Sequence, residues 1–307
     1  MNIKSLLSSY LRLRSIKKHR SRIGWRDAPK YSKYLKYSRR CIKQNIPPAG
    51  VLTDAVNEFN SEGVTSFVTP STEQLAGKMF KRLIQKEKDG LDIWSDANIV
   101  YGNKGYIGNI WNDFPEIEKL FRNDIGLFLM NYYKCYFKIF YGSLYISENV
   151  GERRGSQMWH SDSGPGICVN IMFYLDVTDS SSGVLQAIPW AQSEEIFRKE
   201  IIYFRKMINK IKEMRKEEFR VLLDEFYNNN IREFYENKVC RPLGKSGLVV
   251  PFLNNLIHRG GYPEKGKKRY AFVFHCYPSH KKTNFEYYKN NGIAKSGPYP
   301  KNPAELF

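Results

Sequence analysis

The sequence predicts a mainly β domain with flanking helices and a helical insertion, and three observations support this fold class. After Met158 the chain becomes a series of short apolar segments separated by turn residues, a pattern typical of antiparallel strands. Residues 194–238 interrupt this series with apolar side chains at helical spacing and nearly balanced charge, which predicts one or two inserted surface helices. The chain has 307 residues, 42% of them hydrophobic, which is enough for a sizeable core.

The first 43 residues are set apart by their charge. Residues 1–43 contain 14 Lys or Arg and a single acid, Asp27, whereas the remaining 264 residues hold 35 basic and 30 acidic side chains. The net charge of +18 therefore belongs mainly to a basic N-terminal arm. Because the body is nearly balanced in charge, histone-like binding of nucleic acid over the whole surface is disfavoured.

Three roles for the arm follow from its composition. Apolar residues within 3–16 fall near helical spacing and are accompanied by cations, which favours an amphipathic helix that docks on a membrane surface. A disordered basic tail fits the same composition. Tyrosines alternate with lysines over residues 30–37, which would suit stacking on nucleic-acid bases.

The main folded domain is expected over residues 52–290. A linker at 44–51 precedes it, because this segment contains two prolines and a glycine. A C-terminal tail is expected over 291–307. The sequence therefore predicts one domain that carries an N-terminal arm and a helical insertion.

Three helices are expected before the main strands. The segment 52–59 is amphipathic and is followed by a glycine that can end a helix. Ser71 and Gln74 form a capping-box pattern before an apolar stripe, which predicts a helix over 71–85. A proline is expected to open the third helix, over 115–130.

Aromatic and β-branched residues predict strands in the rest of the domain. The segment 169–175 is apolar throughout, as in a strand buried on both faces. The short run 156–159 is also strand-like. The other expected strands are 64–68, 133–147, 184–188, 247–252 and 270–277.

The cysteines favour a reducing compartment. Five cysteines, widely spaced and without a CxxC pair, argue against a disulfide framework and against a thiolate zinc site. No run approaches the roughly 18 apolar residues of a membrane span. We therefore expect a cytoplasmic protein, placed at the membrane surface if the arm docks there. The sequence contains no P-loop and no GxGxxG, so neither type of nucleotide site is supported.

His160, Asp162 and His258 are the candidate metal ligands. His160 and Asp162 lie two residues apart at the end of the strand-like run, and such side chains point to the same face of an extended segment. His258 is the natural third ligand, because it lies at a predicted strand end before a glycine-rich loop. Two histidines and one carboxylate leave positions open on one side of ferrous iron for a cosubstrate and O₂.

Arg269 is the candidate partner of that cosubstrate. It lies eleven residues after His258, at the start of a predicted strand. If the strands on either side of the intervening loop pair as a hairpin, its side chain points toward the metal ligands. A planar, permanently charged guanidinium suits a dicarboxylate. The set therefore indicates an iron centre chelated by an α-keto acid whose far carboxylate Arg269 holds.

At these positions the sequence resembles the phytanoyl-CoA dioxygenase-like family of Fe(II)/2-oxoglutarate-dependent oxygenases. The resemblance rests on WHSD at 159–162, on GVLQAIP at 183–189, which is similar to the family's G-x-L-x-x-x-P, and on His258 and Arg269 at the usual offset. It covers roughly residues 52–280. The family often has R-x-S at the distal arginine, whereas this chain has R-Y-A, which removes one hydroxyl near the cosubstrate carboxylate.

The resemblance implies a double-stranded β-helix, a cupin-like jelly roll, with flanking helices. It implies Fe(II), with 2-oxoglutarate and O₂ as cosubstrates and ascorbate as a helpful reductant in vitro. The implied reaction couples decarboxylation of 2-oxoglutarate to succinate and CO₂ with hydroxylation of a C–H bond. Asp162 implies a hydroxylase, because similar halogenases carry a small residue there. Polar side chains on neighbouring strands, here Tyr145, Ser147 and Asn170, are implied as further contacts to 2-oxoglutarate.

Cations on two loops favour an anionic substrate. Arg153 and Arg154 precede the metal-ligand segment, and Lys265 and Lys267 follow His258. If both loops border the opening of the site, they select an anion. Together with the basic arm, this fits an anionic glycolipid at a membrane surface, with a soluble small metabolite as the other interpretation.

Two other classes of function remain as alternatives. The first is a non-catalytic β-helix binding protein whose arm engages nucleic acid or a membrane, and the intact set of metal ligands argues against it. The second is a cupin-like isomerase or metal-storage protein, and Arg269 argues against that.

Overall fold

The computed structural model describes residues 29–42, 50, 52–95, 103–149, 151–162, 165–176, 178–291 and 299–306. Within these residues, eight strands form two sheets: β1 (Trp94–Ser95), β2 (Lys104–Tyr106), β3 (Tyr136–Glu148), β4 (Val169–Tyr174), β5 (Gln186–Ala187), β6 (Val249–Leu253), β7 (His258–Arg259) and β8 (Lys268–Ser279). The large sheet has the order β1-β2-β3-β8-β4-β6, and β5 pairs with β7 in a small one. Every pairing is antiparallel. This confirms the β-rich body expected from the sequence.

The long strands β3 and β8 fix the register of the large sheet. Ser147 lies opposite Arg269, and Tyr145 lies opposite Ala271. On its other edge β8 pairs with β4, where Asn170 lies opposite His275. Side chains alternate between the two faces of a strand. These residues therefore share one face of the sheet, and the apolar residues between them along each strand pack on the other face.

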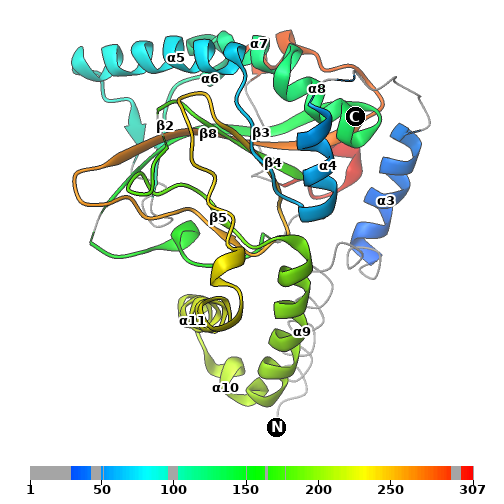
Figure 1. Ribbon diagram of the computed structural model, residues 1–307. Helices are drawn as coiled ribbons and strands as arrows, with labels where there is room; N and C mark the ends of the chain where they lie inside the picture. The colour runs from blue at the N-terminus through cyan, green and yellow to red at the C-terminus, as the bar shows by residue number, and fades with distance from the viewer. Residues whose placement is uncertain are drawn as a thin grey trace.

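Helices cover the outer face of the large sheet, as Figure 1 shows for the group at the top and right of the view. The core contains many large aromatic side chains. Trp111, for example, is buried and stacks on Tyr288 with ring centroids 4.9 Å apart. The covering helices are α4 (Thr53–Glu62), α5 (Pro70–Lys88), α6 (Ile110–Asp113), α7 (Glu116–Arg122), α8 (Asp124–Tyr133) and α12 (Phe285–Asn291).

Two helix predictions are wrong in detail. The cap of α5 is formed by Thr69 and Thr72, not by Ser71 and Gln74: the Thr69 hydroxyl accepts from the Thr72 N–H at 3.1 Å, and the Thr72 hydroxyl accepts from the Thr69 N–H at 2.9 Å. Pro70 then opens the helix, with its φ already suited to the first turn.

The helix expected over 115–130 is divided into α7 and α8. Asn123 separates them with φ −114° and ψ −110°, outside the helical region. The chain turns sharply there, and a side chain on Gly126 would meet the Phe121 carbonyl oxygen at 1.9 Å. The sharp turn therefore depends on a glycine at this position.

Two expected strands are also absent as regular strands. Residues 64–68 contribute only isolated bridges, Val64 to Phe252 and Phe67 to Val249. The run 156–159 includes a 3₁₀ turn, η2 (Gly155–Gln157), rather than a strand.

The helical insertion consists of three helices rather than one or two. They are α9 (Trp190–Lys206), α10 (Ile208–Glu213) and α11 (Lys216–Phe234), and Figure 1 shows them projecting from the β body on the side away from α5. Their apolar faces form a second hydrophobic cluster that includes Trp159 and Ile257. These two residues directly precede His160 and His258, so the insertion packs against the segments that carry both histidines.

Part of the N-terminal arm packs on the domain. Helix α3 (Pro29–Ile42) lies beside the C-terminal segment 299–306, which ends in the 3₁₀ turn η4 (Pro303–Leu306) (Figure 1). The Tyr34 hydroxyl donates to the Pro300 carbonyl at 2.7 Å, and the Tyr37 hydroxyl donates to the Leu306 carbonyl at 3.4 Å. The predicted amphipathic stretch 3–16 and most of the predicted linker lie outside the described residues. Among the described helices, none combines the length and apolarity needed to cross a membrane.

Candidate active site

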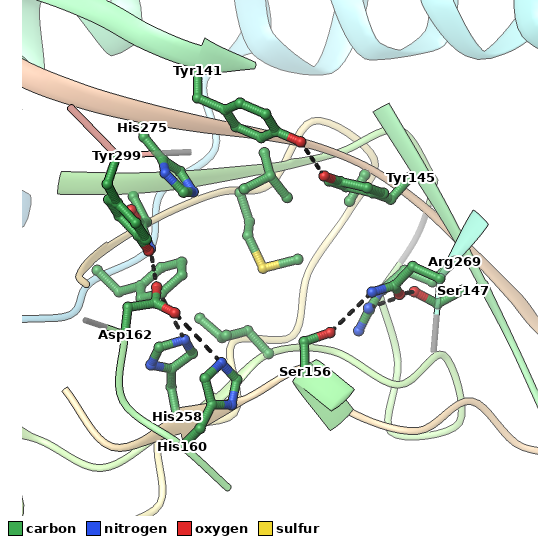
Figure 2. A pocket seen from close by; sticks show the side chains of 18 of the residues that line it. Tyr141, Tyr145, Ser147, Ser156, His160, Asp162, His258, Arg269, His275 and Tyr299 are labelled. Atoms are coloured by element: carbon green, nitrogen blue, oxygen red, sulfur yellow. Dashed lines mark hydrogen bonds and ion pairs between the residues drawn. The ribbon is translucent and has the colours of Figure 1, made fainter. Parts of the chain in front are cut away.

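A cavity of about 390 Å³ opens between the two sheets. Figure 2 shows His160, Asp162 and His258 gathered at one end of it and Arg269 at the other. Its volume falls within the range of roughly 300–1,000 Å³ that is usual for small-molecule sites. The lining combines these polar groups with apolar side chains from β4, β6 and β8, among them Met172, Phe252 and Val273.

Backbone pairing brings the two histidines together. The His160 N–H donates to the His258 carbonyl at 2.9 Å, and the His258 N–H donates back at 2.8 Å. The Asp162 N–H donates to the Asn254 carbonyl at 2.9 Å, which anchors the third residue beside the turn before β7. The His160 and His258 Nε2 atoms lie 3.7 and 3.8 Å from the Asp162 carboxylate oxygens. All three donor atoms lie within 4.8 Å of one another, close enough to share one ion.

The other nitrogen of each histidine is bound to its own backbone. His160 Nδ1 lies 2.7 Å from the Met158 carbonyl, and His258 Nδ1 lies 2.9 Å from the Leu256 carbonyl. A carbonyl can only accept, so each Nδ1 carries the proton and each Nε2 presents a lone pair toward Asp162. This second contact fixes the ring orientation that metal-binding histidines need. The donor set therefore fits a metal ion held on one side.

Charges and burial set the protonation of this cluster. Burial and the neighbouring His258 lower the pKa of His160 to about 3, against a smaller opposing effect of Asp162. Burial raises the pKa of Asp162, but the two histidines and a hydrogen bond from the Tyr299 hydroxyl outweigh it, so the pKa is lowered overall. Asn170 Nδ2 donates to the same carboxylate at 3.0 Å. At neutral pH His160 is therefore neutral and Asp162 ionised, as metal binding requires.

Arg269 is a buried cation at the far end of the cavity. Its Nη2 donates to the Ser147 hydroxyl at 2.7 Å, and its Nη1 donates to the carbonyls of Gly183 and Gly261. Its Nε has no hydrogen-bond partner, and no ion pair with an acidic side chain occurs within the described part of the chain. Burial lowers the pKa of Arg269, but a guanidinium stays charged at neutral pH.

The route by which Arg269 reaches the cavity differs from the expected hairpin. β7 pairs with β5, and β8 pairs with β3 and β4, so β7 and β8 do not pair with each other. Arg269 instead reaches across to the carbonyl of Gly183. That residue has φ +71°, and a Cβ on it would lie 2.5 Å from the Pro263 nitrogen, so the close approach requires glycine.

The residues expected to assist the cosubstrate all line the cavity. They are Tyr145, Ser147 and Asn170. The Ser147 hydroxyl, which accepts from Arg269, also hydrogen bonds to Asn103 Oδ1, and the Tyr145 hydroxyl hydrogen bonds to that of Tyr141. Ser147 thus places a hydroxyl against Arg269 from the neighbouring strand, where the sequence lacks the serine of the R-x-S pattern.

The four loop cations do not line the cavity. Arg153, Arg154, Lys265 and Lys267 are exposed, and Arg154 pairs with Glu152. These four cations face solvent. Their proximity in sequence to the metal ligands therefore does not place them in the cavity. Among the residues that the structure describes, the cations that line the cavity are Arg269 and Arg220 of helix α11.

Sequence reasoning missed several residues of this site, among them Asn103, Tyr141, Arg220 and Tyr299. Arg220 lies in an insertion of balanced charge, where no motif distinguishes it from its neighbours. Tyr299 lies in the segment taken as a tail, and it reaches Asp162 only because that segment folds back against the domain. His275 also lines the cavity, and it stacks on Tyr299 with ring centroids 4.9 Å apart.

Comparison with known proteins supports the fold. No protein-family model matches the sequence, and no curated protein matches it. The solved structure of SnoK, a non-heme alpha ketoglutarate dependent carbocyclase from nogalamycin biosynthesis, is similar with a TM-score of 0.51 and 14% identity, over 75% of this chain and 85% of SnoK. This similarity confirms the double-stranded β-helix.

Two further solved structures are similar at lower scores. The epimerase SnoN, in complex with Fe³⁺, alpha ketoglutarate and nogalamycin RO, matches with a TM-score of 0.49 and 9% identity over 82% of this chain and 94% of SnoN. EctD from S. alaskensis, with 2-oxoglutarate and 5-hydroxyectoine, matches with a TM-score of 0.48 and 14% identity over 87% and 90% of the two chains.

Proposed function

We propose that this protein is an Fe(II)/2-oxoglutarate-dependent oxygenase, similar to the phytanoyl-CoA dioxygenases, that hydroxylates a C–H bond of a small anionic substrate. One observation carries the proposal: a cluster of two histidines and one carboxylate faces a buried arginine across a single cavity. The fold alone would not suffice, because one fold serves many activities.

The chain's own residues fit this assignment at the metal end. Fe(II), when bound, would supply the activation of O₂ that is coupled to decarboxylation of 2-oxoglutarate. His160, His258 and Asp162 would hold it on one side and leave the side that faces the cavity open. Asp162 also favours hydroxylation over halogenation, because its carboxylate occupies the position that a halide would need.

The other end of the cavity fits a dicarboxylate. Arg269 would hold the far carboxylate of 2-oxoglutarate. This carboxylate would neutralise the buried charge of Arg269 and would accept a hydrogen bond from the Arg269 Nε, which has no partner in the structure. Ser147 orients the guanidinium through Nη2. Tyr145 and Asn170 lie along the cavity wall, where they would orient the rest of the cosubstrate.

The apolar part of the lining would protect the reaction. Met172, Leu185, Phe252 and Val273 contribute apolar surface to the cavity. Such walls keep bulk water away from a reactive centre and strengthen the electrostatic contacts within it. The substrate's C–H bond would be placed against this surface, near the open side of the triad.

The location of the protein is part of the same proposal. The basic arm, residues 1–43, would contact a membrane surface through the part that precedes α3, residues 1–28, with the protein otherwise in the reducing cytoplasm. The basic composition of the arm and the five unpaired cysteine thiols support this. Sedimentation with anionic liposomes should pellet the full chain and not a variant that lacks residues 1–28; equal pelleting would contradict the membrane role.

Succinate release tests the proposed chemistry. Wild-type protein supplied with Fe(II), ascorbate and 2-oxoglutarate in air should form succinate, at least at the slow rate seen without substrate. His160→Ala should form none, whereas His280→Ala, which alters a histidine outside the cavity, should match the wild type. A folded wild-type protein that binds no iron and forms no succinate would contradict the proposal and favour a non-catalytic binding protein.

A further inference from the structure

The helical insertion contributes a charged side chain to the active-site cavity. Arg220, on the second turn of α11, lines the same cavity as the metal triad. Its positive charge is one of the smaller effects that lower the pKa of His160, which agrees with its place near that end of the cavity. The insertion is therefore part of the site and not only a surface decoration.

Helix α11 is tied to the segment that carries the first histidine. Asp224, one turn after Arg220, accepts a hydrogen bond from the Trp159 N–H at 2.5 Å, and Trp159 directly precedes His160. The Arg259 guanidinium lies 4.4 Å from the centre of the Trp159 indole ring. The hydrogen bond to Asp224 fixes the position of α11 relative to the metal triad, so the helix presents Arg220 to the cavity from a fixed backbone position.

The apolar face of α11 strengthens this attachment. Tyr227 is fully buried and donates a hydrogen bond to the Glu200 carboxylate on α9 at 2.7 Å. Ile231 packs in the same cluster as Trp159. A helix fixed by both buried apolar contacts and hydrogen bonds presents its remaining side chains in a defined geometry.

The charges inside the cavity indicate which kind of ligand Arg220 would bind. This step rests on the proposed function, because it assumes bound Fe(II) and 2-oxoglutarate. The two positive charges of the ion and that of Arg269 then cancel the single charge of Asp162 and the two of 2-oxoglutarate. Arg220 is a further cation among the described lining residues, and an anionic group of the substrate would complement it there.

We infer that Arg220 binds an oxyanion of the substrate, a carboxylate or a phosphate, and so selects small acids for hydroxylation. A guanidinium that lines a partly apolar cavity, on a helix held by buried contacts, recognises such a group better than exposed loop cations do. The preference for an anion therefore resides on α11, and Arg153, Arg154, Lys265 and Lys267 are not needed for it.

A paired ligand panel tests this inference. The panel contains small carboxylic acids and phosphate monoesters, each with its uncharged amide or alcohol, and is offered anaerobically to the full chain loaded with Fe(II) and 2-oxoglutarate. Ultrafiltration followed by mass spectrometry measures which members are retained. Wild-type protein should retain acids in preference to their uncharged partners, and the acid or phosphate arm of the panel shows which oxyanion is preferred.

Three variants make the result specific to Arg220. Arg220→Gln should lose the preference by about tenfold or more, as expected for a charged hydrogen bond. Arg220→Lys should keep part of it, because the charge remains. Arg232→Gln, which alters an exposed arginine on the same helix, should behave as the wild type does.

Two outcomes would overturn the inference: a wild-type protein without preference for acids, or an undiminished preference in Arg220→Gln. Failure of the proposed function is recognised separately, because a wild-type protein that does not bind 2-oxoglutarate in a metal-dependent way contradicts the oxygenase assignment itself. A protein that binds 2-oxoglutarate normally but shows no preference for acids contradicts only the role of Arg220.

Discussion

Tyr299 donates a hydrogen bond to the carboxylate of Asp162, so the C-terminal segment helps to hold a candidate metal ligand (Figure 2). The Tyr299 ring also stacks on His275 at an interplanar angle of 25°. The segment that carries Tyr299 is in turn held by α3, through the hydrogen bond from Tyr34 to the Pro300 carbonyl. Helix α3 of the basic arm is thereby connected to the metal site through two successive hydrogen bonds, Tyr34 to Pro300 and Tyr299 to Asp162.

The Tyr299→Phe variant should bind metal more weakly. It keeps the aromatic stack on His275 but removes the hydroxyl that orients Asp162. Loss of such a supporting contact typically costs about 10–100-fold in metal affinity. Anaerobic competition between the protein and a coloured chelator measures the Fe(II) dissociation constant. Tyr287→Phe, which alters an exposed tyrosine, serves as the control, and equal affinities of the two variants would show that the hydroxyl does not support Asp162.

The Tyr34→Phe variant should be less stable. It removes the donor to the Pro300 carbonyl, and leaving a buried acceptor unsatisfied costs about 1–3 kcal/mol. Urea denaturation measures the change in the free energy of unfolding, again with Tyr287→Phe as the control. Metal affinity should fall as well, because the segment that carries Tyr299 is loosened. Unchanged stability would mean that α3 does not hold this segment.

The Ser147→Ala variant should bind 2-oxoglutarate about tenfold more weakly, since it removes a hydrogen bond that orients a charged group. Its Fe(II) affinity should not change, because the described contacts of Ser147 are to Arg269 and Asn103 and not to the triad. Isothermal titration of the metal-loaded protein with 2-oxoglutarate measures the effect, with the exposed Ser61→Ala as the control. An unaltered affinity for 2-oxoglutarate would remove Ser147 from the cosubstrate site.

The metal-free protein should lose stability as the pH falls below about 6.5. Burial lowers the pKa of His160 to about 3, whereas an unfolded chain has a histidine pKa of about 6.5. Below that pH the unfolded state binds a proton that the folded state does not, so this group should lower the free energy of unfolding by about 1–2 kcal/mol between pH 6.5 and 5. Urea denaturation with a chelator present, for wild type and His160→Gln, measures the difference. Equal pH dependence in both proteins would contradict it.

The metal ligands could be predicted because their signal is local or chemically rare. His160 and Asp162 are two residues apart, and His258 is one of only five histidines in the chain. Arg269 was identified from its offset, but the expected hairpin was wrong, since the offset reflects a long loop that passes between two different sheets. A spacing can therefore indicate a functional residue without giving the path by which the chain brings it to the site.

Arg220 and Tyr299 could not be predicted, because each reaches the cavity through tertiary packing. Arg220 depends on the burial of the α11 face against Trp159, and Tyr299 depends on the docking of its segment against α3. The break at Asn123 was missed for a similar reason, since it follows from a close approach of α7 to α8 that periodicity does not encode. Local patterns indicate elements and short motifs, whereas packing decides which distant side chains meet.

Anaerobic titration of the protein with 2-oxoglutarate, with and without Fe(II), tests the oxygenase assignment most directly, because it requires no knowledge of the substrate. We expect one 2-oxoglutarate per chain, bound only when the metal is present. We also expect that Arg269→Gln loses this binding while it retains the metal. Stoichiometric metal binding without any metal-dependent binding of 2-oxoglutarate would contradict the assignment as a 2-oxoglutarate-dependent oxygenase.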